Sequence, residues 1–299
     1  MTYDDIAAIF LVPLAEPIAS PDVTTTPARR LRDALEPIAT QGWWSRAAGE
    51  RLTSLGVDFF PGYVWGRAAS LGVPPSAVVA ATFGVFDPAM IGAVYEAGAA
   101  AVGRDAILSA RADGAAASVG SVAADDECLA LAEPLLEVLG DLDVLGRPLF
   151  GALRSLPMPA SPSGRLWRAA ELVREHRGDA HLAALVSAGL DAVEAYVLTE
   201  RWLGFALGEY SATRGFGPDA IAAATARLAT RGWMEGHELT DAGRRARVGI
   251  EDATDAGQAP LVAALGSALD DVVVAASAIS ARLIDAGSFP ADPRKRAGG

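Results

Sequence analysis

The chain has 299 residues, of which 51% are hydrophobic and 21% charged, and its formal net charge at pH 7 is −12. This apolar content suffices for one large or two ordinary cores, so large-scale disorder is excluded. The negative charge repels phosphates at long range, so nucleic-acid binding would require arginines gathered on one surface. Alanine is abundant, and glycine and proline recur as punctuation between short periodic stretches, which predicts a mainly α protein.

The first 26 residues form an N-terminal extension ahead of the first well-signalled helix. Its apolar stretch, residues 6–19, is interrupted by Pro13 and Glu16, and Asp4 and Asp5 stand where a signal peptide needs positive charge. We therefore expect neither a targeting peptide nor a membrane span. The single cysteine cannot form an internal disulfide, so a cytoplasmic location fits best.

Residues 27–153 are predicted to form a helical domain. Thr26 suits the N-cap of its first helix, and Pro27 suits the first helical position. Further helix starts and glycine stops follow at short intervals: residues 45–56, 74–84, 87–98 and 125–140. Residues 154–165 then carry three prolines and three small polar residues without helical periodicity, which predicts a linker.

The densest group of charged and titratable residues is "REHRGDAH", residues 174–181. Apolar residues before it recur at helical spacing, Gly178 can end that helix, and Asp179 can cap the next one. In this interpretation the charges only stabilise helix ends through the helix dipole. The alternative is that the stretch forms the polar wall of a site.

Residues 165–258 are predicted to form a winged-helix-like domain. Two helices, a short β-hairpin around residues 233–239 and a long helix after the N-cap Thr240 follow one another in the winged helix-turn-helix order. The stretch 226–255 is similar to the end of a MarR-type domain. Together with residues 166–195, it resembles an actinobacterial family of uncharacterised helical proteins with a degenerate, MarR-like domain at the C-terminal end.

The resemblance covers residues 27–258 and implies a fold more than a chemistry. The chain departs from that family at Gly84, Val85 and Phe86, where an aromatic-Asn-Phe string is usual, and at Ala180, where glycine is usual. The family has no settled activity, so the site must be argued from the residues.

Four arginines are the candidates for contacting DNA. Arg227 and Arg231 belong to the second helix of the helix-turn-helix, and Arg244 and Arg245 belong to the helix after the hairpin. Alanines fill the other outward positions of the second helix. Binding of duplex DNA by a ligand-responsive transcriptional regulator is therefore the alternative hypothesis, and it is the less favoured one.

The favoured hypothesis is a small-molecule site at the domain junction. Four aromatic residues of the first half are assigned to its apolar wall: Tyr63, Trp65, Phe83 and Phe86. Either Arg174 or Arg177 is expected to hold an anionic group such as a carboxylate, enolate or phenolate. The ligand is therefore expected to be aromatic or anionic.

Three residues of the same stretch are the candidates for catalysis. Either His176 or His181 is the proton carrier, and neighbours such as Asp179 adjust its pKa. The sequence contains no phosphate-binding glycine loop, dinucleotide fingerprint, His-Glu-x-x-His or paired cysteine site, so we expect no cofactor and no metal. An enzyme of specialised metabolism would then use acid–base chemistry: cyclisation, isomerisation, elimination or hydrolysis.

A third hypothesis is a helical interaction protein whose charges are structural. Residues 260–285 are predicted as a C-terminal helix whose apolar surface could pack on either domain or on a second subunit, as in a homodimer. Residues 286–299 are predicted as a flexible tail.

Overall fold

The computed structural model describes residues 2–12, 16 and 25–294. The first part of the chain contains α1 (Tyr3–Phe10), α2 (Pro27–Ala39), α3 (Gln41–Trp44), α4 (Arg46–Ser54), α5 (Phe59–Ala68), α6 (Ser76–Phe83), α7 (Pro88–Ala101), α8 (Arg104–Gly120), α9 (Asp125–Asp141) and α10 (Pro148–Arg154). The second part contains α11 (Pro162–Ser187), α12 (Ala192–Trp202), α13 (Pro218–Thr230), β1 (Met234–Glu235), β2 (Glu238–Leu239), α14 (Asp241–Ala256), α15 (Ala259–Leu265) and α16 (Leu269–Asp285). The prediction of a mainly α fold with a short β-hairpin is confirmed.

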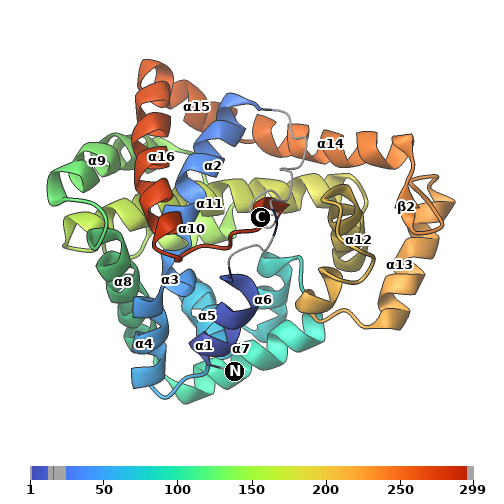
Figure 1. Cartoon of the computed structure of the whole chain (residues 1–299), viewed down its shortest axis with the longest axis horizontal. Helices are drawn as coiled ribbons and strands as arrows, with labels where there is room; N and C mark the ends of the chain where they lie inside the picture. Colours follow the sequence, from blue (N-terminus) through green and yellow to red (C-terminus); the bar gives the residue numbers. More distant parts are fainter. Residues whose placement is uncertain (1, 13–15, 17–24, 295–299) are drawn as a thin grey trace.

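Helix α11 is the central element of the fold (Figure 1). It begins after the N-cap Ser161 and runs for 26 residues, straight through Gly178. The predicted helix end at Gly178 is therefore wrong, and Asp179 caps no second helix. Glycine costs about 1 kcal/mol inside a helix. Tertiary contacts outweigh this cost, because α11 packs against α2, α8 and α9 along one part and against α14 along the other.

Two of the predicted helix starts are confirmed by their caps. The Thr26 hydroxyl accepts a hydrogen bond from the Arg29 amide at the start of α2. The Thr240 hydroxyl accepts one from the Gly243 amide at the start of α14. These signals depend on neighbouring residues alone, so the sequence shows them directly.

The largest apolar core joins helices that are far apart in the sequence. It combines side chains of α2, α8, α9 and the first half of α11 with those of α15 and α16. Figure 1 shows α16 lying beside α2. The predicted C-terminal helix is divided in two, because a 3-10 turn, Gly266–Ala268, separates α15 from α16. By length and composition the segment Ala259–Asp285 could span a membrane, a property that core helices of soluble proteins share.

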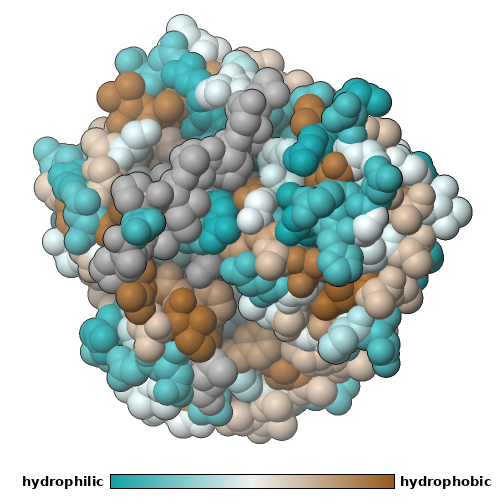
Figure 2. Space-filling model, turned by 45° about the vertical axis from the view of Figure 1, so that its right-hand side comes forward, coloured by the Kyte–Doolittle hydropathy of each residue, from teal (hydrophilic) through white to brown (hydrophobic). Residues whose placement is uncertain are grey.

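A second core lies among α12, α13, α14 and the hairpin, and a third lies among α5, α6, α7 and α8. Helix α11 contributes to the first core through residues such as Trp167 and to the second through Leu185. The division into units at residues 27–153 and 165–258 stays a prediction. Helix α11 belongs almost wholly to the second proposed unit and also packs against α2, α8 and α9 of the first. On the face shown in Figure 2, hydrophilic and hydrophobic residues are intermixed.

Candidate functional site

Helices α2, α5, α6, α11 and α12 enclose a cavity of about 130 Å³. Five arginines contribute to its wall: Arg32, Arg67, Arg174, Arg177 and Arg214. Glu36 is the one carboxylate residue of the described wall. The wall of this cavity therefore carries more guanidinium groups than carboxylates.

Six of the predicted site residues line this cavity: Tyr63, Phe83, Phe86, Arg174, Arg177 and His181. The last three share one face of α11, because positions three and four residues apart are neighbours on a continuous helix. Residues of the charged stretch 174–181 and aromatic residues of α5 and α6 therefore line the same cavity. The charged stretch lies on one unbroken helix, instead of the predicted pair of helices.

The other three predicted residues lie outside the cavity. The Trp65 side chain is 1% exposed, and its Nε1 donates to the Val102 carbonyl at 2.9 Å. The Asp179 carboxylate accepts a hydrogen bond from the Phe150 amide at 2.9 Å, and burial raises its pKa to about 6. Trp65 is thus a core residue, and Asp179 anchors α10 to α11.

His176 also faces α10. Its ring packs edge-on against Phe150, and its Nδ1 lies 2.8 Å from Oε1 of Gln258. Burial lowers its pKa to about 4, so the imidazole is neutral near pH 7. Of the two predicted proton carriers, His176 is packed between α10 and Gln258, whereas His181 lines the cavity.

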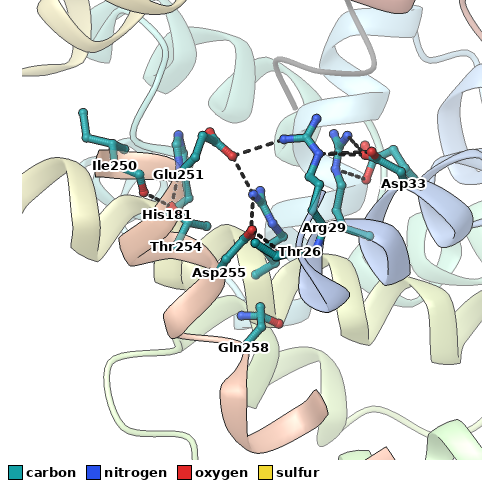
Figure 3. Close-up of polar contacts among 12 residues, drawn as sticks. Thr26, Arg29, Asp33, His181, Ile250, Glu251, Thr254, Asp255 and Gln258 are labelled. Atoms are coloured by element: carbon teal, nitrogen blue, oxygen red, sulfur yellow. Dashed lines mark hydrogen bonds and ion pairs between the residues drawn. The ribbon is translucent and has the colours of Figure 1, made fainter. Parts of the chain in front are cut away.

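His181 has a defined tautomer. The Thr254 hydroxyl donates to the Ile250 carbonyl at 2.7 Å, so its oxygen accepts from Nδ1–H of His181 at 3.0 Å (Figure 3). Burial lowers the pKa of His181 to about 3. The neutral ring therefore keeps an unprotonated Nε2, which can accept a hydrogen bond.

Four of the five cavity arginines belong to a connected network of ion pairs. Arg67 binds both oxygens of Glu175, at 2.8 and 2.7 Å. Arg174 lies 3.0 Å from Glu175 and 3.1 Å from Glu36, and Arg32 lies 3.8 Å from Glu36. Burial alone would raise the pKa of Glu175, but the Arg67 and Arg174 guanidinium groups outweigh it and hold this pKa at about 2.

The network continues from α2 to α14, and Figure 3 shows Glu251 facing Arg29. Glu251 accepts from Arg29 at 3.1 Å and from Arg177 at 2.7 Å. Asp255 accepts from Arg177 at 3.1 Å and from the Thr26 hydroxyl at 2.5 Å. These contacts join the first helix of the cavity to the last helix of the winged region.

Arg214 differs from the other four cavity arginines. In the part of the chain that the structure describes, it makes no ion pair with a carboxylate. Its Nε donates to the Tyr196 hydroxyl at 2.5 Å, and its Nη2 donates to the Tyr210 hydroxyl at 3.2 Å. The guanidinium also lies over the rings of Phe86, Tyr196 and Tyr210, at 4.9 to 5.1 Å. Its positive charge is thus surrounded by neutral groups.

The loop between α12 and α13 positions Arg214. The residue ends a short 3-10 helix, Ser211–Arg214, and Gly215 follows with a φ of +88°. The Arg214 carbonyl accepts from the Asp87 amide at 2.8 Å, and a side chain at Gly215 would meet Met90 at 2.8 Å. The glycine therefore permits both the left-handed turn and the close approach to α7.

A larger cavity of about 510 Å³ adjoins the first. The two share Glu36, Tyr63, Arg174 and Arg214 in their walls. The larger wall is mainly apolar, with aromatic residues from α1, α3 and α5 and from the segment around Tyr210. We call this cavity the aromatic chamber and the smaller one the arginine chamber.

Two of the four predicted DNA contacts are occupied by other partners. Arg227 pairs with Asp191 at 2.6 Å and with Glu194 at 2.9 Å. Arg231 donates to the carbonyls of Ala188 and Gly189. Arg244 and Arg245 are exposed on α14, where the described residues form no ion pair with them.

The outward surface of α13 has few groups that could contact a base edge. Apart from Arg227 and Thr230, its exposed residues are Pro218, Asp219 and alanines. In the described ranges, no group of three or more His, Cys, Asp and Glu side chains could hold a metal ion.

Helices α12 and α13, the hairpin and α14 follow one another in winged helix-turn-helix order, so the fold defines a helix-turn-helix protein. A family model described as a helix-turn-helix family matches residues 28–290. The chain belongs to this family. Neither the comparison with curated proteins nor that with solved structures gives a match.

Proposed function

We propose that this helix-turn-helix protein binds an organic anion in the arginine chamber, with Arg214 holding the anionic group. The observation that carries the proposal is the position of Arg214, which lines both chambers and has neutral neighbours. A guanidinium has five N–H donors, and the two hydrogen bonds to tyrosines leave donors for a ligand. A carboxylate there would gain charge-assisted hydrogen bonds and compensate a desolvated charge.

The other predicted wall residues fit supporting roles. Tyr63, Phe83 and Phe86 offer apolar surface, and Nε2 of His181 can accept a hydrogen bond from a hydroxyl of the ligand. Acid–base catalysis is most efficient when the pKa of the catalytic group lies near the working pH. With a pKa of about 3, His181 is a weak base, so we assign it to orienting the ligand.

Calorimetric titration with benzoate and with its neutral amide, benzamide, tests the proposal. The parent should bind benzoate more tightly than benzamide. Arg214→Gln should weaken benzoate binding by about 10- to 100-fold, because a charged hydrogen bond contributes about 1.5–3 kcal/mol. Arg227→Gln, which alters a guanidinium paired on the surface, should leave the affinity unchanged.

Two results would overturn this assignment. One is a parent protein that does not distinguish benzoate from benzamide. The other is an Arg214→Gln variant that binds benzoate as tightly as the parent. If affinity is instead lost in Arg177→Ala but kept in Arg214→Gln, the anion binds at the predicted α11 residues.

A ligand-responsive DNA-binding regulator is the second candidate. Membership of the helix-turn-helix family favours it, and so does the composition of the cavity wall. Ala195, Tyr196 and Thr199 of α12 line the arginine chamber, and Arg214 lies in the loop that leads to α13. A ligand would therefore contact the helix-turn-helix directly. We also propose that the helix-turn-helix domain is MarR-like, that the protein is cytoplasmic and that it acts in specialised metabolism.

Fluorescence anisotropy against pooled genomic fragments separates the two candidates. Because α13 presents few free donors, we expect no sub-micromolar, sequence-selective binding at physiological salt. Sub-micromolar binding that falls on replacing Arg244 and Arg245 by Gln would establish DNA contact through α14 and make the regulator the better assignment.

A further inference from the structure

The aromatic chamber extends the site beyond the anionic group. It has about four times the volume of the arginine chamber, 510 against 130 Å³. A buried apolar cavity of about 150 Å³ accommodates benzene, whereas pockets for drug-sized ligands span about 300–1,000 Å³. The arginine chamber is therefore sized for an acidic group with at most one ring, and the aromatic chamber is sized for a larger body.

The rings of the aromatic chamber are arranged in pairs. Trp43 meets Tyr63 edge-on with centroids 5.3 Å apart, and Phe60 stacks with Tyr63 at 6.2 Å. Phe10 of α1 lies 5.7 Å from the ring of Trp44. Such walls present both faces and edges of rings, and these favour planar aromatic groups.

Helix α1 forms one wall of this chamber through Ile6, Ile9 and Phe10. It has eight residues, and an isolated helix of this length is unstable in water. The Tyr3 hydroxyl donates to the Trp44 carbonyl at 2.9 Å, and Ile6 packs in a small apolar cluster with Trp43 and Phe59. Ile9 is nevertheless 59% exposed, so the residues that the structure describes leave part of the apolar face of α1 uncovered.

We infer that the ligand is an amphipathic organic acid whose acidic group lies at Arg214 and whose planar, multi-ring body fills the aromatic chamber against α1. The inference rests on the proposed function, because the acidic group is what places the body. Arg174, Arg214, Glu36 and Tyr63 border both chambers, so one molecule can occupy both. In this arrangement Ile9 and Trp44 limit the size of the ligand that is bound. Arg214 selects for its negative charge.

Three acids with the same carboxylate and a growing ring system test this inference by calorimetric titration of the full chain: benzoate, 2-naphthoate and anthracene-2-carboxylate. Each added ring should tighten binding about tenfold, since burying its apolar surface is favourable. Ile9→Asp should remove most of this gain, measured within the variant as the ratio of its affinities for anthracene-2-carboxylate and benzoate. Val274→Asp introduces the same charge at a valine that is 68% exposed on α16, and it should have no effect.

The outcomes separate this inference from the proposed function. Equal affinities for the three acids, each lost in Arg214→Gln, would overturn the inference and leave the proposed function standing. A gain with ring number that survives Ile9→Asp unchanged would also overturn it, because α1 would then not contact the body. If no acid binds the parent, both are overturned. A larger gain for each ring in the parent than in Ile9→Asp supports the inference.

Discussion

Replacing Glu251 by Gln should destabilise the protein by about 3–5 kcal/mol, the usual cost of breaking a buried ion pair from one side. Three buried arginines donate to its carboxylate: Arg29 at 3.1 Å, Arg177 at 2.7 Å and Arg247 at 2.7 Å. Burial would raise the pKa of Glu251, but these guanidinium groups hold it well below its usual range, so the group is ionised. Glutamine keeps the shape and removes the charge, which leaves the arginines buried and poorly compensated.

Urea unfolding followed by circular dichroism measures this loss directly. For 299 residues the entropy of unfolding is roughly 0.6 kcal/mol/K, so the same loss should lower Tm by about 5–8 °C in calorimetry. The matched control is Glu133→Gln, because Glu133 also pairs with an arginine, Arg165, at 2.7 Å but is 54% exposed. An exposed pair contributes less than about 1 kcal/mol.

A Glu251→Gln variant that loses no more stability than Glu133→Gln would refute this reasoning. It would mean that water or neighbouring groups compensate the three arginines. The network would then hold α2, α11 and α14 together no more strongly than surface pairs do.

Three further predictions concern the packing around α11 and α8. Because folded His176 has a pKa of about 4 and the unfolded residue about 6.5, the unfolded state takes up a proton first, and about 2–3 kcal/mol of stability should be lost between pH 7 and 4.5. Urea unfolding of His176→Gln should lack this part of the pH dependence. Asp179 acts in the opposite sense, since its raised pKa penalises the folded state increasingly from about pH 4 to pH 6 and fully above that; Asp179→Asn should stabilise by about 1–2 kcal/mol at pH 7 and lose that gain near pH 4. A Cβ at Gly114 would lie 2.5 Å from the Ala48 Cα, so Gly114→Ala should cost about 1–3 kcal/mol, whereas Gly103→Ala meets nothing within 4 Å and should be nearly neutral by calorimetry.

The sequence predicted the helical class and the caps of α2 and α14 well, because these depend on residues close together in the chain. It failed at Gly178 and Asp179 for a physical reason. A glycine followed by an aspartate has the composition of a helix junction, but the Asp179 carboxylate is used by the Phe150 amide, 29 residues away. Local signals cannot show which tertiary donor will claim such a group.

The sequence identified only those residues of the cavity wall that lie in a local pattern. Tyr63, Phe83 and Phe86 belong to an aromatic cluster visible in the sequence, and Arg174, Arg177 and His181 recur at helical spacing. Arg214 has no such signal. Its stretch "RGFG" has only the glycines typical of a turn, while its partners Tyr196 and Phe86 lie 18 and 128 residues earlier in the chain.

The position of Arg214 links the cavity to the helix-turn-helix physically. Its side chain lies on Tyr196 of α12, and its carbonyl is held by the Asp87 amide at the start of α7. Four residues later α13 begins at Pro218, so a displacement of the guanidinium acts on the loop that sets the start of α13. At the other end of the helix pair α12 and α13, Arg227 of α13 binds Asp191 and Glu194 at the start of α12. These two ion pairs tie the start of α12 to α13, and in the proposed function α12 is the helix that a ligand at Arg214 contacts.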